Sequence, residues 1–220
     1  MEATAEESRR ATKLKRLQNL PDFSVPLYWD NVAPAGELTM VPLQPSSLEF
    51  QTLEKNFRKT VNKTVHSIQR IQSPRLRQAY ELHLNYTSHK NGQSRGEAER
   101  LLYRGASQEF CESVKQTGFN RSYPGVNGTS YGGGMYFAVA ANTSSGYAVK
   151  DAEGHRRMFV ARVVTGRFTG GHRNMKTPPC CFPRQHRLHC DSAVDDVQNP
   201  GLFVVFHDNA AYPDHLITFK

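Results

Sequence analysis

The chain has 220 residues and a mass of 24.8 kDa, which fits one domain with its own hydrophobic core and a short tail. A hydrophobic share of 38% and an aromatic share of 10% exclude a disordered or fibrous protein. The net charge of +8 suits a polyanion or a small phosphate-rich ligand. The Lys and Arg residues are dispersed, without an RNA-binding or zinc-finger signature, so nucleic acid is not expected as the main partner.

Membrane insertion and secretion have no visible signal in the sequence. No apolar run approaches the roughly 18 residues that a membrane span needs. The start of the chain, residues 1–16, is charged and lacks the apolar segment of a signal peptide. We therefore expect no membrane partner and an intracellular location, in the nucleus, the cytoplasm or both.

The first 20 residues are polar and predict an exposed helix or a disordered tail, followed by a single domain over residues 21–220. The segment that opens this domain is rich in proline. Pro26 and Pro42 in particular are compatible with extended chain at the edge of a sheet.

Two helices are expected in the first half of the chain. Ser46 and Glu49 predict a capping box, and Ser73 before Pro74 predicts a second helix start. The apolar face of the first helix is expected to consist of Phe50, Leu53, Phe57 and Val61, and that of the second of Leu76, Ala79, Tyr80 and His83. A strand with β-branched residues lies between them, and residues 88–97 predict a turn-rich connection.

The second half of the chain is dominated by short strands. The expected strands, each β-branched or aromatic and bounded by Gly, Pro or Asn, are residues 98–105, 133–140, 156–168, 201–208 and 215–220. One helix interrupts them, from Ser107 to Thr117, with Gly118 as its C-terminal stop. Because helices do not alternate with the strands, the pattern predicts an α+β fold with a mainly antiparallel sheet.

A glycine-rich turn, Tyr131–Gly134, leads directly into a strand that carries Tyr136. Glycine permits a ligand or another backbone to approach closely, although a flexible hairpin would show the same pattern. The chain contains no GxxxxGK[ST] motif, and the turn precedes a strand and not a helix. A kinase-like P-loop and a Rossmann dinucleotide site are therefore not expected.

Four segments taken together resemble a known family. They are Tyr103–Gly105, Gly118–Ala138, Asn142–Tyr147 and Asn199–Asp208. In this order and spacing they are similar to the catalytic domain of the diphtheria-toxin-like ADP-ribosyltransferases, the poly(ADP-ribose) polymerase family. The likeness is greatest to the mono-ADP-ribosylating members that carry macrodomains. It implies an α+β ADP-ribosyltransferase fold, with split, mainly antiparallel sheets and flanking helices.

The resemblance also implies a reaction and a binding site. A single ADP-ribose would pass from NAD, the co-substrate, to a side chain of another protein or of the chain itself, with release of nicotinamide. The backbone of Gly105 and the hydroxyl of Ser144 would hold the nicotinamide carboxamide. Tyr136 matches the family's site tyrosine, and Tyr147 matches a second aromatic that stacks on the nicotinamide ring. Flat contacts of this kind would hold the leaving ring while positive charge builds on the ribose.

Two site positions depart from the family pattern. Leu202 stands where other members have a glutamate, and this change implies transfer of single units without chain elongation. Arg104 stands where the family has a histidine that contacts a ribose hydroxyl of the adenosine end. An arginine could donate to a hydroxyl or a phosphate, obstruct the adenosine pocket, or point into solvent. The alternative function is therefore a catalytically inactive domain that acts as a binding or scaffolding module.

Four cysteines are present, three of them clustered with two histidines in the segment CCFPRQHRLHC. They do not form a disulfide framework spread over the fold, so a reducing compartment is expected. The spacing of Cys180, Cys181, His186, His189 and Cys190 fits a structural zinc site poorly. We therefore expect a solvated loop and no metal.

Overall fold

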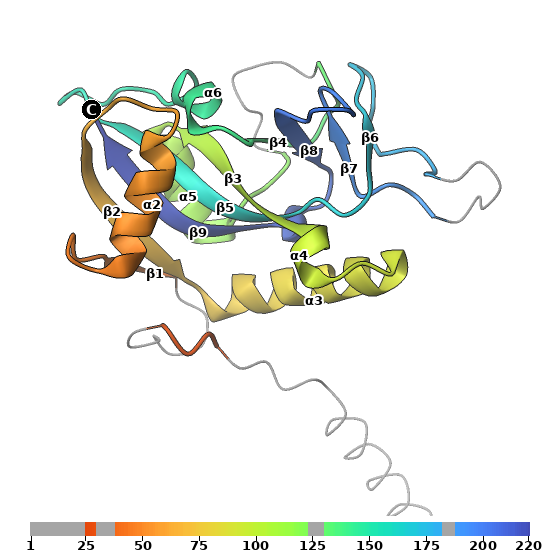
Figure 1. The fold of residues 1–220 in the computed structure, drawn as a ribbon, viewed down its shortest axis with the longest axis horizontal. Helices are drawn as coiled ribbons and strands as arrows, with labels where there is room; N and C mark the ends of the chain where they lie inside the picture. The colour runs from red at the N-terminus through yellow and green to blue at the C-terminus, as the bar shows by residue number, and fades with distance from the viewer. Residues whose placement is uncertain (1–24, 30–37, 123–129, 182–187) are drawn as a thin grey trace, which may run out of the picture.

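The computed structural model describes residues 25–29, 38–122, 130–181 and 188–220, and within them the chain folds around one nine-stranded sheet (Figure 1). The strand order is β1-β2-β9-β5-β3-β4-β8-β7-β6. Every neighbouring pair is antiparallel except β6 with β7. The strands are β1 (Thr39–Pro42), β2 (Val65–Gln72), β3 (Glu99–Ala106), β4 (Met135–Ala138), β5 (Arg156–Val164), β6 (Phe168–Gly170), β7 (Ser192–Val194), β8 (Leu202–Val205) and β9 (Ala211–Phe219).

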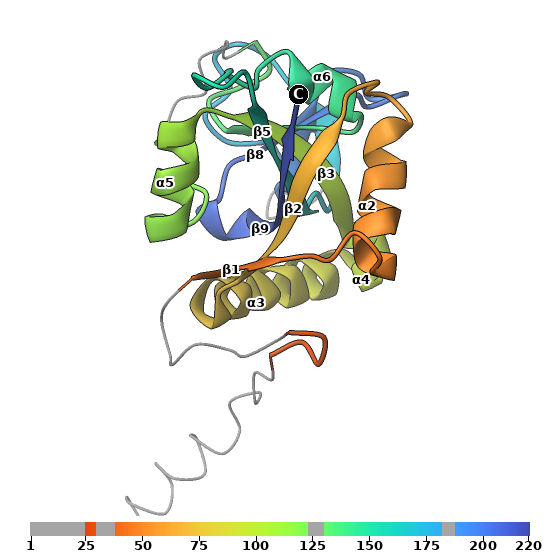
Figure 2. The same cartoon turned by 90° about the vertical axis from the view of Figure 1, so that its left-hand side faces the viewer.

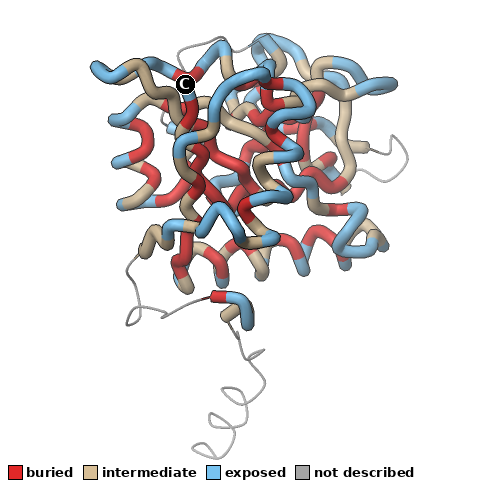
Figure 3. Tube along the Cα trace, turned by 60° about the vertical axis from the view of Figure 1, so that its left-hand side comes forward, coloured by how far each residue is buried: buried red, intermediate tan, exposed pale blue. Residues whose placement is uncertain are grey.

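Helices cover the sheet from several sides. They are α2 (Leu48–Arg58), α3 (Pro74–Asn91), α4 (Arg95–Ala98), α5 (Gln108–Thr117), α6 (Ala141–Ser145) and the 3₁₀ helix η1 (Asp208–Ala210). Figure 2 shows α2 and α5 on opposite sides of the sheet, with α3 running below its lower end. Buried residues are concentrated in the interior of the described chain, and exposed residues lie toward its outside (Figure 3). This architecture confirms the predicted α+β class with a mainly antiparallel sheet.

The sheet consists of two halves that meet between β3 and β4. One register pair, Tyr103 with Ala138, joins these two strands, whereas β3 pairs with β5 over eight residues. The half from β1 to β3 carries α2, and the half from β4 to β6 carries the glycine-rich turn. We call the place where β3 and β4 stop pairing the seam. It gives the predicted split of the sheet a definite location.

Most predicted helix boundaries are confirmed by their capping contacts. The hydroxyls of Ser73 and Ser107 accept the backbone N–H groups of Leu76 and Phe110, as N-caps of α3 and α5. Pro42 lies in the edge strand β1, as predicted. The expected tail, residues 1–20, lies outside the described residues. Within the described ranges, none of the helices combines the length and the apolar character needed to cross a bilayer.

Two predicted boundaries are wrong. The cap of α2 is Ser47 and not Ser46, and its hydroxyl accepts the N–H of Phe50 at 3.2 Å. Glu49 takes no part in a capping box because its carboxylate binds elsewhere. The predicted turn at residues 88–97 begins too early, since α3 continues to Asn91 and ends at Gly92 with a φ of 61°.

An ionic cluster explains where the carboxylate of Glu49 goes. Arg70 on β2 donates from Nε and Nη2 to the two oxygens of Glu49, at 2.9 and 2.6 Å. The ring Nε2 of His215 on β9 lies 2.8 Å from the same carboxylate. Partial burial alone would raise the pKa of Glu49, but the hydrogen bonds from His215 and Arg70 outweigh it and lower the pKa to about 2. The cluster therefore fastens α2 to two strands.

This cluster predicts an acid-sensitive contribution to stability. A carboxylate whose pKa is lowered by folding stabilises the protein above its unfolded pKa of about 4.5, and the contribution is lost as the pH falls toward about 2. We expect Glu49→Gln to lower the free energy of unfolding by about 1–2 kcal/mol at pH 7, less than the full linkage value because Glu49 is partly exposed. Below pH 3 the difference from the wild type should shrink. Denaturant unfolding across this pH range measures both effects.

The matched control is Glu54→Gln, which removes a carboxylate from the same helix that pairs only with Arg58 on the surface. Its effect should stay within about 0.5 kcal/mol. Equal losses in the two variants, or a Glu49→Gln loss that does not depend on pH, would contradict the assigned role of Glu49.

Candidate functional site

The predicted site residues near the seam lie on two faces of the sheet. Tyr103, Ala138 and Leu202 lie in line across β3, β4 and β8, because Ala138 is the register partner of both others. Alternate residues of a strand share a face. Gly105 and Tyr136 therefore lie on the face of Leu202, whereas Arg104 lies on the opposite face.

Gly105 lies directly against the segment that follows α6. A Cβ atom built on it would lie 2.3 Å from the carbonyl oxygen of Ser144 and 2.8 Å from the amide nitrogen of Ala148. Real Cβ atoms do not approach backbone this closely, so the position requires glycine. The structure thus brings Gly105 and Ser144 together, as the sequence predicted.

Ser144 is 4% exposed, and its hydroxyl donates to the carbonyl oxygen of Tyr103 at 2.9 Å. A hydroxyl that donates one hydrogen bond keeps lone pairs that can accept another. Ser144 can therefore accept an amide N–H of a ligand at Gly105 without releasing Tyr103. This contact with Tyr103 was not predicted from the sequence, since it joins residues 41 positions apart.

Tyr136 is held by the glycine-rich turn. Its hydroxyl donates to the carbonyl oxygen of Gly132 at 2.8 Å and accepts the N–H of Tyr131 at 2.9 Å. Tyr136 packs against a small cluster of buried residues that includes Val204 and Phe206, and burial raises the pKa of the phenol. Tyr136 is thus fixed at both ends, which suits a side chain that orients a ligand.

Tyr147 and Leu202 are more open. The side chain of Tyr147 is 49% exposed, so its ring has a free surface. Leu202 is partly buried, and its N–H and that of Gly201 both donate to Asp195 Oδ1 at 2.9 Å. Asp195 thereby fixes the start of β8. No residue of the four recognised segments pointed to this aspartate. The available signal was an acidic residue shortly before the turn Asn199–Gly201, which needs its N–H groups satisfied.

Arg104 does not point into solvent, so that alternative is wrong. Its guanidinium carbon lies 4.8 Å from the ring centre of Phe110 and 5.6 Å from that of Phe137. Nη1 donates to the carbonyl oxygen of Tyr136 at 3.0 Å and so bridges the seam from β3 to β4. Burial lowers the pKa of the guanidinium to about 10, which leaves it charged at neutral pH.

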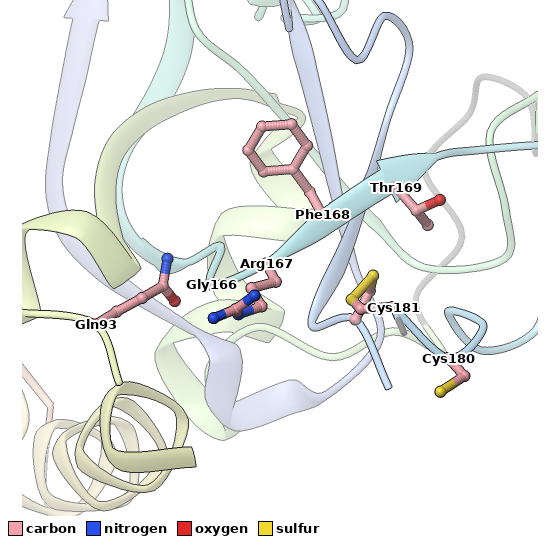
Figure 4. Close-up of a pocket in the computed structure, with 8 residues that line it drawn as sticks. Gln93, Gly166, Arg167, Phe168, Thr169, Cys180 and Cys181 are labelled. Atoms are coloured by element: carbon pink, nitrogen blue, oxygen red, sulfur yellow. A yellow bond between two sulfur atoms is a disulfide. The ribbon is translucent and has the colours of Figure 1, made fainter. Parts of the chain in front are cut away.

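The cysteine-rich segment, predicted as a solvated loop, contains a disulfide. Cys181 and Cys190 are joined in a disulfide, so their sulfurs are not available as zinc ligands. A disulfide between these two residues was not predicted, and His186 lies outside the described residues. Two residues at this end of the sheet, Arg167 and Phe168, line a cavity of about 420 Å³ beside the disulfide (Figure 4). None of the predicted site residues lines this cavity.

Comparison with known proteins assigns the family. Residues 47–220 match the model of the poly(ADP-ribose) polymerase (PARP) catalytic domain. This chain belongs to that family. It is 36% identical over 199 residues to human protein mono-ADP-ribosyltransferase PARP14 and 40% identical over 195 residues to mouse protein mono-ADP-ribosyltransferase PARP10. Human protein mono-ADP-ribosyltransferase PARP12 is 34% identical over 198 residues.

These alignments cover 89%, 85% and 89% of the chain but 11%, 20% and 28% of the respective relatives. The chain thus spans less than a third of the length of each of these three relatives. The match confirms the predicted family. The roles of the individual site residues remain predictions, and the geometry of the PARP domain described above shows which of them lie together.

The close approach at Gly105 yields a prediction for this PARP domain. We expect Gly105→Ala to lower the free energy of unfolding by about 1–3 kcal/mol, because the new methyl group meets the Ser144 and Ala148 backbone. Denaturant unfolding measures the loss. Gly96→Ala in α4 is the control, since a Cβ there meets nothing within 4 Å and alanine favours a helix. A Gly105→Ala variant as stable as Gly96→Ala would contradict the described packing.

Proposed function

We propose that this chain is an NAD-dependent protein mono-ADP-ribosyltransferase, which transfers one ADP-ribose to a protein side chain and releases nicotinamide. The similar proteins are named mono-ADP-ribosyltransferases, which supports the reaction class. The observation that carries the proposal is the arrangement at the seam, where the backbone of Ser144 and that of Tyr147 lie against Gly105. Ser144 itself is buried, and Tyr147 is half exposed. The acceptor can be another protein or the chain itself. An intracellular location is part of this proposal and rests on the sequence alone.

The residues present fit the nicotinamide end of NAD. The edge of β3 at Gly105 has no register partner on β4, so its backbone can bind a flat carboxamide. Ser144 retains lone pairs for the amide N–H. Tyr147 offers an open ring face for stacking, and the doubly held Tyr136 stands on the same face of the sheet as Gly105.

In the proposed transfer, bonds and charges balance without a metal or an oxidant. The bond from the nicotinamide nitrogen to ribose C1′ breaks, and its electron pair leaves with nicotinamide as a neutral amide. A carboxylate oxygen of the acceptor forms the new bond to C1′, so no proton need move. Positive charge develops on the sugar during this step. The protein contributes by holding the leaving ring and the sugar in line.

Leu202 fits transfer of a single unit. It lies in line with Ala138 and Tyr103 across the seam and brings no polar group there. A leucine cannot polarise a ribose hydroxyl, so the first ADP-ribose unit would not be activated to accept another. We therefore propose mono-transfer and not polymer synthesis.

Tyr147 provides the sharpest test of this proposal. Tyr147→Ala should lower the rate of ADP-ribose transfer about tenfold or more, because aromatic stacking contributes about 0.5–1.5 kcal/mol beyond buried area and the ring also contributes contact area. Thermal stability should hardly change, since the ring is half exposed. Intact-mass spectrometry after incubation with NAD measures the added units. We expect at most one unit per acceptor site in the wild type.

Tyr86→Ala on α3 is the matched control, because this tyrosine is also exposed, at 66%, and belongs to a helix outside the predicted site. Transfer should persist in it. No mass addition by the wild type, together with no binding of a nicotinamide analogue, would favour the inactive scaffold instead.

A further inference from the structure

Arg104 places a positive charge at the seam that no carboxylate of the described residues neutralises. Its surroundings are the rings of Phe110 and Phe137 and the carbonyl oxygen of Tyr136. A cation taken out of water is costly unless it is paired. A negatively charged ligand would supply the missing partner.

A nearby arginine shows that this arrangement is particular to Arg104. Arg157, at the start of β5, donates to Asp151 Oδ2 at 2.9 Å and is thus neutralised. The guanidinium of Arg104 donates instead to an uncharged carbonyl group. One hydrogen bond leaves most of its five N–H groups for a ligand.

The start of α5 adds a second positive element. This ten-residue helix begins two residues after β3 ends, and Phe110 in its first turn lies under the Arg104 guanidinium. The N-terminal turn of a helix carries partial positive charge and favours anions. The exposed carboxylate of Glu109 in the same turn offsets part of this charge, so the preference for an anion rests on the guanidinium of Arg104.

The pleat of β3 determines which part of a ligand would meet this charge. Arg104 and Gly105 are consecutive, so they lie on opposite faces of the sheet. A ligand that touches both must pass through the seam, where β3 and β4 have no further register pair. In NAD the diphosphate lies between the nicotinamide riboside and the adenosine. A dinucleotide with its carboxamide at Gly105 thus brings its diphosphate toward Arg104.

We propose that Arg104 binds the diphosphate of the dinucleotide and makes the site selective for diphosphate-bearing ligands. This inference rests on the proposed function and extends it. On binding, N–H groups of the guanidinium that are not bonded to the Tyr136 carbonyl oxygen donate to a phosphate oxygen. Because Arg and phosphate form strong bidentate contacts, the charged contact is the stronger of the two. The site then recognises charge at a position where related proteins recognise a ribose hydroxyl.

Calorimetric titration tests this proposal with two probes. ADP-ribose carries the diphosphate, and 3-aminobenzamide carries only the carboxamide-bearing ring. Arg104→Gln should weaken ADP-ribose binding by about 10- to 100-fold, the usual effect of losing a charged hydrogen bond. The affinity for 3-aminobenzamide should stay within about twofold. Raising the salt concentration should weaken ADP-ribose binding more in the wild type than in the variant.

Two further variants complete the design. Arg104→Met keeps a long apolar stem over the two rings, so it tests the loss of charge even if Arg104→Gln folds poorly. Arg100→Gln is the matched control, because Arg100 lies on the same strand and face and also over an aromatic ring, that of Phe203, at 5.2 Å. Arg100 is exposed, and the substitution Arg100→Gln removes the same positive charge as Arg104→Gln. ADP-ribose should bind Arg100→Gln as it binds the wild type.

The possible results separate this proposal from the one on which it rests. Unchanged or tighter ADP-ribose binding in the Arg104 variants would overturn the diphosphate role, and tighter binding would identify Arg104 as an obstruction. An equal loss of ADP-ribose affinity in Arg100→Gln would show that only the net charge matters, and it would overturn the diphosphate role as well. In these cases binding of 3-aminobenzamide by the wild type would still support the proposed function. A wild type that binds neither probe would overturn both proposals.

Discussion

The interruption of hydrogen bonding between β3 and β4 is the constraint on which the rest of the site depends. An antiparallel ladder that continued past Tyr103 and Ala138 would use the backbone groups of Gly105 and Tyr136 for the sheet itself. Buried backbone groups released from a ladder need other partners. Ser144 satisfies the carbonyl oxygen of Tyr103, and Arg104 satisfies that of Tyr136. The chain thus tolerates an opening in its sheet because nearby side chains supply hydrogen bonds that a ligand can share or replace.

Each half of the sheet is stabilised by its own contacts, so the seam stays open without loosening the fold. On one side the carboxylate of Glu49 fastens α2 to β2 and β9 through Arg70 and His215. On the other side the hydroxyl of Tyr136 closes the glycine-rich turn. The common core includes Phe137 and Phe159, whose side chains join the two halves behind the seam. Rigid halves with an interrupted boundary are a sound way to position a ligand.

Local sequence signals predicted the elements well where short-range contacts decide them. The caps at Ser73 and Ser107 are confirmed because each hydroxyl bonds a backbone N–H three residues ahead. The cap at Ser46 failed because Glu49 binds partners 21 and 166 residues away. β7 was missed, since a strand of three residues has little periodicity to detect. The motifs identified Arg104, and its position next to Gly105 in a strand predicts that the two lie on opposite faces. The aromatic rings around the Arg104 guanidinium could not be predicted, because they depend on long-range packing.

In the proposed site, the two departures that the family resemblance implies would act together on the charge. Leucine at position 202 removes the negative charge that a glutamate would bring to one face of the seam. Arginine at position 104 adds a permanent positive charge on the other face, where the family has a histidine. Both changes make the seam more positive. For the proposed reaction this shift favours a negatively charged donor, and it also removes the carboxylate that would repel an acidic acceptor. Single-unit transfer to an acceptor carboxylate and recognition of a diphosphate are thus consistent consequences of one electrostatic change.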